Sequence, residues 1–250
     1  MVRAMLTLTD FNTLTFDCYG TLIDWERGIL DEVRPWLDRH GLQRLSDPEI
    51  LEAFASYEGA CEAETPATPY PAILQEVHVR LARQWGLPPD PAGAAAFGQS
   101  VGRWPAFPDT PAALQYLKRH YKLVILSNVD RASFAITNQK LGVEFDLIVT
   151  AQDVGSYKPD RRNFEHLLAA LGKAFGTQKK DVLHTACSVF HDIVPAKALG
   201  LKTAWIDRRR DQSFGASPNA GENEEARRPD LTVRSMAEFV ACHRKQLGAA

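Results

Sequence analysis

The 250-residue sequence has little cysteine, no excess of charge of one sign and no long apolar run. Its four cysteines, Cys18, Cys61, Cys187 and Cys242, lie far apart and form no CxxC pair. We therefore expect reduced thiols and no disulfide framework. The formal net charge of −2 gives no electrostatic reason to expect nucleic acid or an acidic membrane surface as a partner.

Recognisable targeting and membrane signals are also lacking. The first residues, "MVRAMLTLTDFNTL", carry only a short apolar run that Asp10 interrupts, which is unlike a signal peptide. No apolar stretch is long enough to span a bilayer. The composition, with 45% hydrophobic and 24% charged residues, is that of an ordinary globular protein. These features together favour a cytoplasmic protein that binds neither membrane nor nucleic acid.

Several common catalytic patterns are missing, and one is present by chance. The sequence has no Walker loop, no HExxH and no zinc pattern. The stretch "GQSVG" (98–102) matches G-x-S-x-G, but a serine nucleophile of that type needs a strand before it and a helix after it. Ser100 instead follows an Ala-rich helical segment, so we interpret it as a helix end.

Short apolar runs alternate with helical patterns over much of the chain. Five runs are typical of buried parallel strands and lie at 13–16, 122–128, 145–150, 181–186 and 202–207. Helical patterns follow at 111–120, 131–142, 163–176 and 193–200. This alternation predicts an α/β fold with a doubly wound parallel sheet.

The region after the first strand breaks this alternation. From about residue 25 to 104 one helical pattern follows another, which predicts an all-helical insertion over the sheet edge. We therefore expect a core domain of residues 1–23 and 106–250 and a helical cap of residues 24–105. The tract 208–230 is polar and rich in Gly and Pro, and we expect an exposed loop there.

Four short motifs place polar residues where the expected strands end. Asp17 ends the first strand, and "LSN" puts Ser127 and Asn128 at the end of the second. "SYKPD" puts Lys158 just after the third, and "SVFHD" puts Asp192 at the end of the fourth, where it opens a helix. Because ligands of such sheets bind beyond the carboxyl ends of the strands, we expect these side chains to meet there.

The residue types at these positions suit an aspartate nucleophile that forms a covalent ester. Lys158 would keep Asp17 ionised, and a second carboxylate at Asp192 would help water attack the ester. Each residue also has a plainer interpretation: Asp192 as a helix N-cap, Asn128 as a turn residue and Lys158 as a solvated surface lysine.

Taken together, "FDCYGT", "LSN", "YKPD" and "HDIVPAKALGL" resemble the four motifs of the haloacid dehalogenase superfamily, in the right order and with fitting spacing. The resemblance covers residues 11–23 and about 106–207. It implies a Rossmann-like core with an inserted cap, and Asp17 as the nucleophile. It places around Asp17 the residues Thr21, Ser127, Asn128, Lys158 and Asp192.

Two positions separate the sequence from the phosphatases of that superfamily, which usually carry Asp-x-Asp in the first motif and bind magnesium. Tyr19 replaces the second aspartate, and a phenol of pKa near 10 is a poor proton shuttle at neutral pH. Cys187 stands where the fourth motif usually has its first acid, and a thiol suits magnesium badly. The "DxYGT" turn is similar to that of the (S)-2-haloacid dehalogenases.

Other positions depart from that dehalogenase branch. Its enzymes use a cap arginine, but "EAFASYEGACEAE" has none at the expected position. Arg27 is a candidate substitute, or else a surface residue at a helix start. Val189 replaces the usual Asn and Phe164 an aromatic hydroxyl, whereas His191 either positions water or is a bystander.

The residues expected at the site fall into four groups. Catalytic roles are predicted for Asp17, Lys158 and Asp192, and substrate contacts for Cys18, Tyr19, Thr21, Arg27, Ser127, Asn128 and His191. From the cap, the pocket candidates are Tyr57, Glu58, Tyr70 and His78. An apolar wall or hinge is expected at Trp104, Pro105 and Phe107.

The sequence thus predicts a hydrolase that displaces halide from a small 2-halocarboxylate through an ester on Asp17, without a metal or other cofactor. One alternative is a magnesium-dependent phosphatase acting on a small phosphate ester through Asp17 and Asp192. Another is a catalytically weak metabolite-binding protein of the same fold. The resemblance also suggests a homodimer.

Overall fold

A parallel six-stranded sheet forms the centre of the molecule, and the computed structural model describes residues 6–208 and 227–248. The strand order is β3-β2-β1-β4-β5-β6, so the first strand lies in the middle. The strands are β1 (Thr13–Phe16), β2 (Lys122–Ser127), β3 (Leu147–Thr150), β4 (Val182–Ala186), β5 (Lys202–Ile206) and β6 (Leu231–Val233). Each pairs in parallel with its neighbours, which confirms the doubly wound α/β fold.

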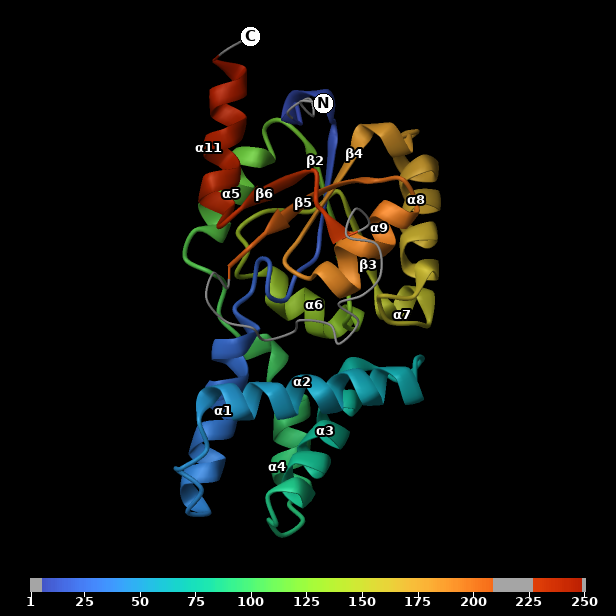
Figure 1. Ribbon diagram of the computed structural model, residues 1–250. Helices are drawn as coiled ribbons and strands as arrows, with labels where there is room; N and C mark the ends of the chain where they lie inside the picture. Colours follow the sequence, from blue (N-terminus) through green and yellow to red (C-terminus); the bar gives the residue numbers. More distant parts are fainter. Residues whose placement is uncertain (1–5, 209–226, 249–250) are drawn as a thin grey trace.

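Helices cover both faces of the sheet because alternate strand residues point to opposite sides. In β2, Leu123 and Ile125 belong to one apolar cluster, and Val124 and Leu126 belong to the other. The first cluster includes side chains of α5 (Thr110–Leu117), α6 (Arg131–Asn138) and α11 (Met236–Leu247). The second includes side chains of α8 (Arg161–Phe175) and α9 (Val194–Ala198). Figure 1 shows α8 and α9 on one side of the sheet, and α5 and α11 on the other.

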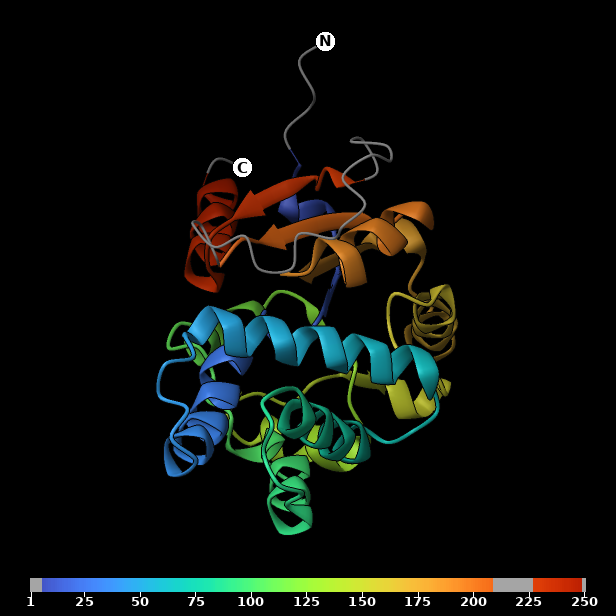
Figure 2. The same ribbon diagram turned by 60° about the horizontal axis from the view of Figure 1, so that its bottom comes forward.

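Four helices between β1 and α5 form a separate layer at the end of the sheet where β1 ends (Figure 1). We call residues 24–105 the helical insert. Its helices are α1 (Trp25–Arg39), α2 (Asp47–Glu64), α3 (Tyr70–Gln84) and α4 (Pro91–Gly98). Figure 2 shows α2 running across the insert, with α3 and α4 beside it. A Ser46–Glu49 capping box begins α2.

Aromatic side chains form the interior of the insert. Trp36 packs on His78 at a ring-centroid distance of 4.2 Å, and Phe97 contacts both His78 and Phe54. His78 is 4% exposed and belongs to this packing, so the pocket role expected for it is not supported.

The two chain segments that join the insert to the core run side by side. Asp24 N donates to Pro105 O at 2.8 Å, and Phe107 N donates to Leu22 O at 3.1 Å. Next to this junction, Trp104 is buried, and its indole donates to Ser100 Oγ at 3.2 Å. Ser100 therefore supports Trp104 and does not sit in a nucleophile turn.

The structure also differs from the sequence expectations. It adds β6 and α11, which follow the tract 208–230, and most of that tract (209–226) lies outside the described residues. The helix α6 ends at Asn138, earlier than expected, and the helix α8 begins at Arg161, also earlier than expected. Within residues 6–208 and 227–248, no helix combines the length and apolar character that crossing a bilayer requires.

At two helical glycines of the insert, we expect substitution by alanine to have opposite effects on stability. A Cβ at Gly28 would lie 2.3–2.7 Å from atoms of Trp104, whereas a Cβ at Gly59 meets nothing within 4 Å. We expect Gly28→Ala to lower the free energy of unfolding by about 1–3 kcal/mol through overpacking. Gly59→Ala, the matched control, should raise it by about 0.5–1 kcal/mol because alanine is the better helix former. Urea denaturation of both variants measures the two effects, and equal stability would contradict the packing described for Trp104.

Candidate active site

Asp17 directly follows β1, the central strand, and both of its carboxylate oxygens are held. Thr21 Oγ1 donates to Oδ2 at 2.7 Å, and Lys158 Nζ donates to Oδ1 at 2.9 Å. The side chain is buried, with 6% of the residue exposed. Thr21 in turn accepts a hydrogen bond from Cys187 N at 2.9 Å, which ties the turn after β1 to the segment after β4.

Lys158 joins the two carboxylates that the sequence motifs single out. Its Nζ donates to Asp192 Oδ1 at 2.7 Å and to Leu126 O at 3.0 Å, in addition to Asp17. These three bonds use all the donors of an ammonium group. The structure therefore brings together the three predicted catalytic residues, and it corrects the interpretation of Lys158 as a surface lysine.

One buried cation stands between two buried carboxylates, which sets their protonation. Burial alone would raise the pKa of Asp192, but Lys158 and a hydrogen bond from His184 outweigh it and lower this pKa to about 2. Burial raises the pKa of Asp17, and the charge of Asp192 raises it further. Lys158 lowers this pKa, but not enough to cancel the effect of burial. Burial would lower the pKa of Lys158, but the two carboxylates raise it above its usual value.

Asp192 reaches this cluster from a π-helical segment, Val189–Ile193, and not from the end of β4 as expected. The strand ends at Ala186, and Ser188 is the residue that caps the segment. The N-cap interpretation of Asp192 is therefore wrong. The wider turn places a fully buried carboxylate beside the sheet, and such π segments are frequent at functional sites.

Asn128 holds the backbone of Lys158 from both sides. Its Oδ1 accepts from Lys158 N at 2.7 Å, and its Nδ2 donates to Lys158 O at 3.0 Å. These bonds give Asn128 a supporting role, and the substrate contact expected for it stays a prediction. Ser127 is different: its Oγ is buried and has no hydrogen-bond partner among the described residues, so it is free to contact a ligand.

His184 is a site residue that the sequence motifs did not single out. It lies in the middle of β4, fully buried, with Nε2 3.0 Å from Asp192 Oδ1 and Nδ1 2.8 Å from Thr15 Oγ1. A histidine within an apolar strand next to the fourth motif was the available signal. Strand periodicity alone could not show that it faces Asp192.

Tyr19 and Cys18 lie beside Asp17 in different surroundings. The Tyr19 hydroxyl bonds Thr137 Oγ1 at 2.9 Å, and its ring packs edge-on against Trp104. Burial raises the pKa of Tyr19 well above its usual value, which makes the phenol a still weaker proton donor. The Cys18 side chain is fully buried in the hydrophobic core, and the substrate contact expected for Cys18 stays a prediction.

Arg27 and His191 differ in how close they come to the cluster. The Arg27 side chain is 67% exposed and pairs with Asp31 on the same helix, so the structure does not bring it to the site. His191 adjoins Asp192 in sequence and is half-buried. Burial lowers its pKa to about 4, which leaves the imidazole neutral at pH 7.

The insert faces the cluster with acids in place of the missing arginine. Glu62 of α2 is 8% exposed, and its Oε2 lies 3.4 Å from Asn128 Nδ2. One turn earlier, Glu58 accepts a hydrogen bond from the Tyr70 hydroxyl. Burial raises the pKa of Glu58 to about 7, and burial together with the nearby Glu58 raises that of Glu62 well above its usual value.

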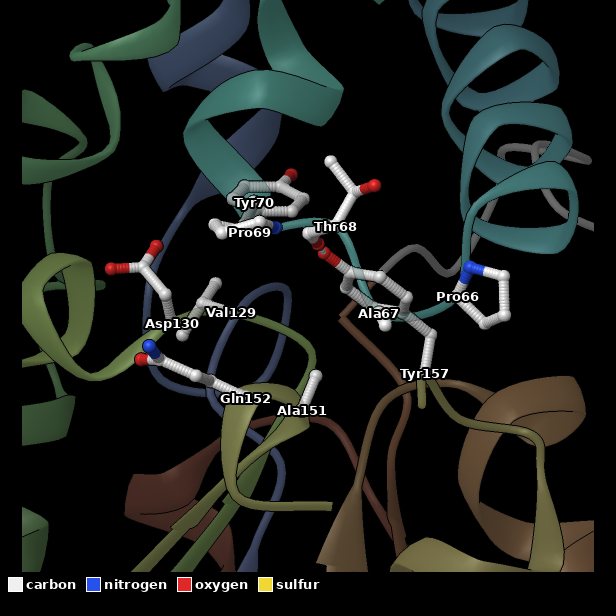
Figure 3. A pocket seen from close by; sticks show the side chains of 10 residues that line it. All are labelled: Pro66, Ala67, Thr68, Pro69, Tyr70, Val129, Asp130, Ala151, Gln152 and Tyr157. Atoms are coloured by element: carbon white, nitrogen blue, oxygen red, sulfur yellow. Dashed lines mark hydrogen bonds between the residues drawn. The ribbon is translucent and has the colours of Figure 1, made fainter. Parts of the chain in front are cut away.

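A narrow cavity between core and insert lies close to the cluster, but Asp17, Lys158 and Asp192 do not line it. Figure 3 shows the loop 66–70 of the insert lying across from Val129, Asp130, Gln152 and Tyr157 of the core. The cavity between them is about 10 Å³, room for roughly one water molecule. Tyr157 closes one side, since its hydroxyl donates to Thr68 O at 2.6 Å.

The donor set at the cluster suits a magnesium ion poorly. Cys187 supplies a soft thiol where the phosphatases have an acid, and Lys158 already supplies the charge between Asp17 and Asp192. In the part of the chain that the structure describes, no three His, Cys, Asp or Glu side chains are grouped so that they could hold a metal ion.

Comparison with known proteins places this geometry in a family. The family model for haloacid dehalogenase-like hydrolases matches residues 11–185. The (S)-2-haloacid dehalogenase of Pseudomonas sp. strain YL is 27% identical over 221 residues, 82% of this chain and 88% of that protein. The phosphoserine phosphatase of Thermus thermophilus is 30% identical over 152 residues, 59% of this chain and 55% of that protein.

Solved structures agree on the fold. The L-2-haloacid dehalogenase of Xanthobacter autotrophicus has a TM-score of 0.75 at 20% identity, over 94% of this chain and 98% of its own. A second structure of that enzyme carries covalently bound chloropropionic acid. The magnesium-bound hydrolase YfnB of Bacillus subtilis has a TM-score of 0.73 at 14% identity, over 94% and 99%. With the motif residues gathered at the end of the central strand, this chain belongs to the haloacid dehalogenase-like hydrolases.

Proposed function

We propose that this hydrolase works through a covalent ester on Asp17 and removes halide from a small 2-halocarboxylate. The observation that carries the proposal is the geometry of Asp17, whose carboxylate is fixed by Thr21 on one oxygen and by Lys158 on the other. A carboxylate held in this way is oriented for attack, and Asp192 on the same ammonium is placed for a second step.

In the first step, a carboxylate oxygen of Asp17 attacks the carbon that bears the halogen. A C–O bond forms, the carbon–halogen bond breaks, and halide leaves with the bonding electrons. Asp17 must be ionised for this attack, and the positive charge of Lys158 favours that form. The halide needs no proton, so the reaction does not call on an acid at the position of Tyr19.

In the second step, water attacks the ester carbonyl of Asp17. The free Oδ2 of Asp192 takes a proton from this water, since it is buried and has no partner among the described residues. The acyl C–O bond then breaks, and the departing alkoxide takes the proton of the new Asp17 carboxyl group, which releases a 2-hydroxy acid and regenerates the Asp17 carboxylate. Asp192 gives its proton to solvent. Lys158 balances the charge of both carboxylates through the cycle.

The position of Tyr19 favours carbon–halogen chemistry over phosphate ester hydrolysis. An alcohol leaving group needs a proton, and the Tyr19 phenol is bonded to Thr137 and has a raised pKa. The similarity to (S)-2-haloacid dehalogenases over most of the chain also supports this choice. The covalent chloropropionic acid in the Xanthobacter enzyme is consistent with an ester on the matching fold.

The helical insert acts as a cap in this proposal. Asp17 and Lys158 are 6% and 2% exposed, so a substrate enters only when the insert and the core separate. The contacts that separation breaks include Tyr157 to Thr68 and Asn128 to Glu62. The hydroxyl of Ser127 then receives the substrate carboxylate when the site closes.

A magnesium-dependent phosphatase is the second candidate. It is favoured by the unpaired Oδ2 of Asp192, a hard oxygen ligand, and by the similarity to phosphoserine phosphatase. A third candidate, a catalytically weak metabolite-binding protein, would leave Asp17 without a chemical role.

Halide release from (S)-2-chloropropionate and fluoroacetate by EDTA-treated protein tests the proposal. We expect metal-free release that Asp17→Asn lowers by at least about 10³-fold, because the variant lacks the nucleophile. The matched control is Asp38→Asn, an exposed aspartate of α1, which should release halide at the unchanged rate.

Other outcomes of this assay point to the other candidates. Release of phosphate from small esters only with added magnesium would favour the phosphatase. Ordered binding without product, unchanged in Asp17→Asn, would favour the binding protein.

From the pKa of Glu58 we expect substrate binding to depend on pH. Its pKa of about 7 means that the carboxyl is neutral below pH 7 and charged above it. An anionic substrate is then repelled at higher pH, and we expect its KM to rise roughly fivefold from about pH 6 to about pH 8, the effect of about 1 kcal/mol of repulsion. Steady-state kinetics of Glu58→Gln should lack this rise.

Tyr70→Phe provides the control for the same residue. The Tyr70 hydrogen bond lowers the pKa of Glu58, so its loss should shift the rise in KM to higher pH. A KM that rises identically in wild type, Glu58→Gln and Tyr70→Phe would show that another group is responsible.

A further inference from the structure

We propose that His184 is a positioning residue for ester hydrolysis, which fixes Asp192 so that its free oxygen faces the attacking water. The inference rests on the two-step reaction proposed above. It starts from an imidazole that is fully buried in β4 and has polar partners on both ring nitrogens.

The sheet register supplies the first partner. Thr15 of β1 pairs with His184 of β4 in the parallel ladder, so their side chains stand side by side on one face of the sheet. Thr15 Oγ1 lies 2.8 Å from Nδ1. The ring of Phe164 packs edge-on against the imidazole at 5.1 Å. The register and the hydrogen bond to Thr15 direct Nε2 at Asp192.

The second partner determines which nitrogen carries a proton. Asp192 has a strongly lowered pKa and is ionised, so its carboxylate only accepts hydrogen bonds. Nε2 lies 3.0 Å from Asp192 Oδ1 and therefore carries the hydrogen. Oδ1 also accepts from Lys158 at 2.7 Å. Two donors on one oxygen fix the plane and direction of the carboxylate.

The consequence falls on the other oxygen. Asp192 Oδ2 is buried and has no hydrogen-bond partner among the described residues. A buried carboxylate oxygen without a donor is costly unless a ligand or water fills the position. With Oδ1 held by His184 and Lys158, Oδ2 is presented to the site as the acceptor for a water proton. Lys158 also holds Asp17, but His184 contacts Asp192 and not the nucleophile, so its effect is confined to the second step.

The assignment is tested by measuring the two steps separately on the full-length protein with (S)-2-chloropropionate. Rapid-quench halide release measures ester formation, and intact-protein mass measures the ester on Asp17 as it forms and decays. In His184→Leu we expect ester formation to change by less than about threefold. Ester hydrolysis should slow by about 10- to 100-fold, the usual cost of removing a hydrogen bond to a buried charged group, so that the ester accumulates.

Three further variants keep the test decisive. His184→Gln places an amide N–H near the position of Nε2 and should recover part of the hydrolysis rate. Thr15→Val removes the other hydrogen bond of the ring and should give a smaller defect in the same step. Phe164→Leu changes packing around the ring without removing a polar group, and should leave the ratio of the two rates unchanged.

Each result decides between the possibilities. Ester decay at the wild-type rate in folded His184→Leu, or in Thr15→Val should His184→Leu fail to fold, overturns the assignment alone. Equal slowing of both steps overturns it in favour of a purely structural role. A wild-type protein that releases no halide and forms no ester overturns the dehalogenation proposal, and this assignment with it.

Discussion

A single buried ammonium group, that of Lys158, holds the site together. Removing two carboxylates and an ammonium from water is costly, and the cost is recovered only when the geometry satisfies all of them. Here Lys158 reaches Asp17, Asp192 and a strand-end carbonyl at 2.7–3.0 Å. Because one positive charge serves two negative ones, the carboxylates are not equivalent: Asp192 keeps its charge most firmly, and Asp17 is the one whose pKa is raised. The proposed division of roles, with Asp17 as nucleophile and Asp192 as base, is consistent with this charge balance.

Residues from neighbouring strands hold that ammonium group in place. Lys158 comes from a loop eight residues beyond β3, and Asn128 at the end of β2 holds its backbone N–H and C=O. Thr21 performs a similar task for Asp17, since it links the turn after β1 to the segment after β4. The positions that touch the reacting atoms are therefore few, and each is fixed by a neighbour from another strand.

The sequence predicted the fold class and which side chains meet, because strand ends and turn residues leave local patterns. Asp17, Lys158 and Asp192 could be found in this way. The supporting residues could not, since their roles depend on long-range register: His184 reads as one more residue of a buried strand, and Glu62 as one more acid on a helix. Arg27 was left open between a substrate contact and a surface position, because a helix position does not reveal which way a long side chain turns. The strand β6 and helix α11 were missed because they follow a polar tract for which the sequence predicts only a loop.

The junction between insert and core has a consequence for how this protein can change over generations. The chain leaves the sheet after β1 and returns beside the point of departure, where Asp24 bonds Pro105 and Phe107 bonds Leu22. An insertion whose two ends lie side by side adds little constraint on the domain that carries it. Helices between these ends can be lengthened, shortened or exchanged by recombination while the strands keep their register. The helical layer can therefore diverge while Asp17, Lys158 and Asp192 keep their places at the end of the sheet beneath it.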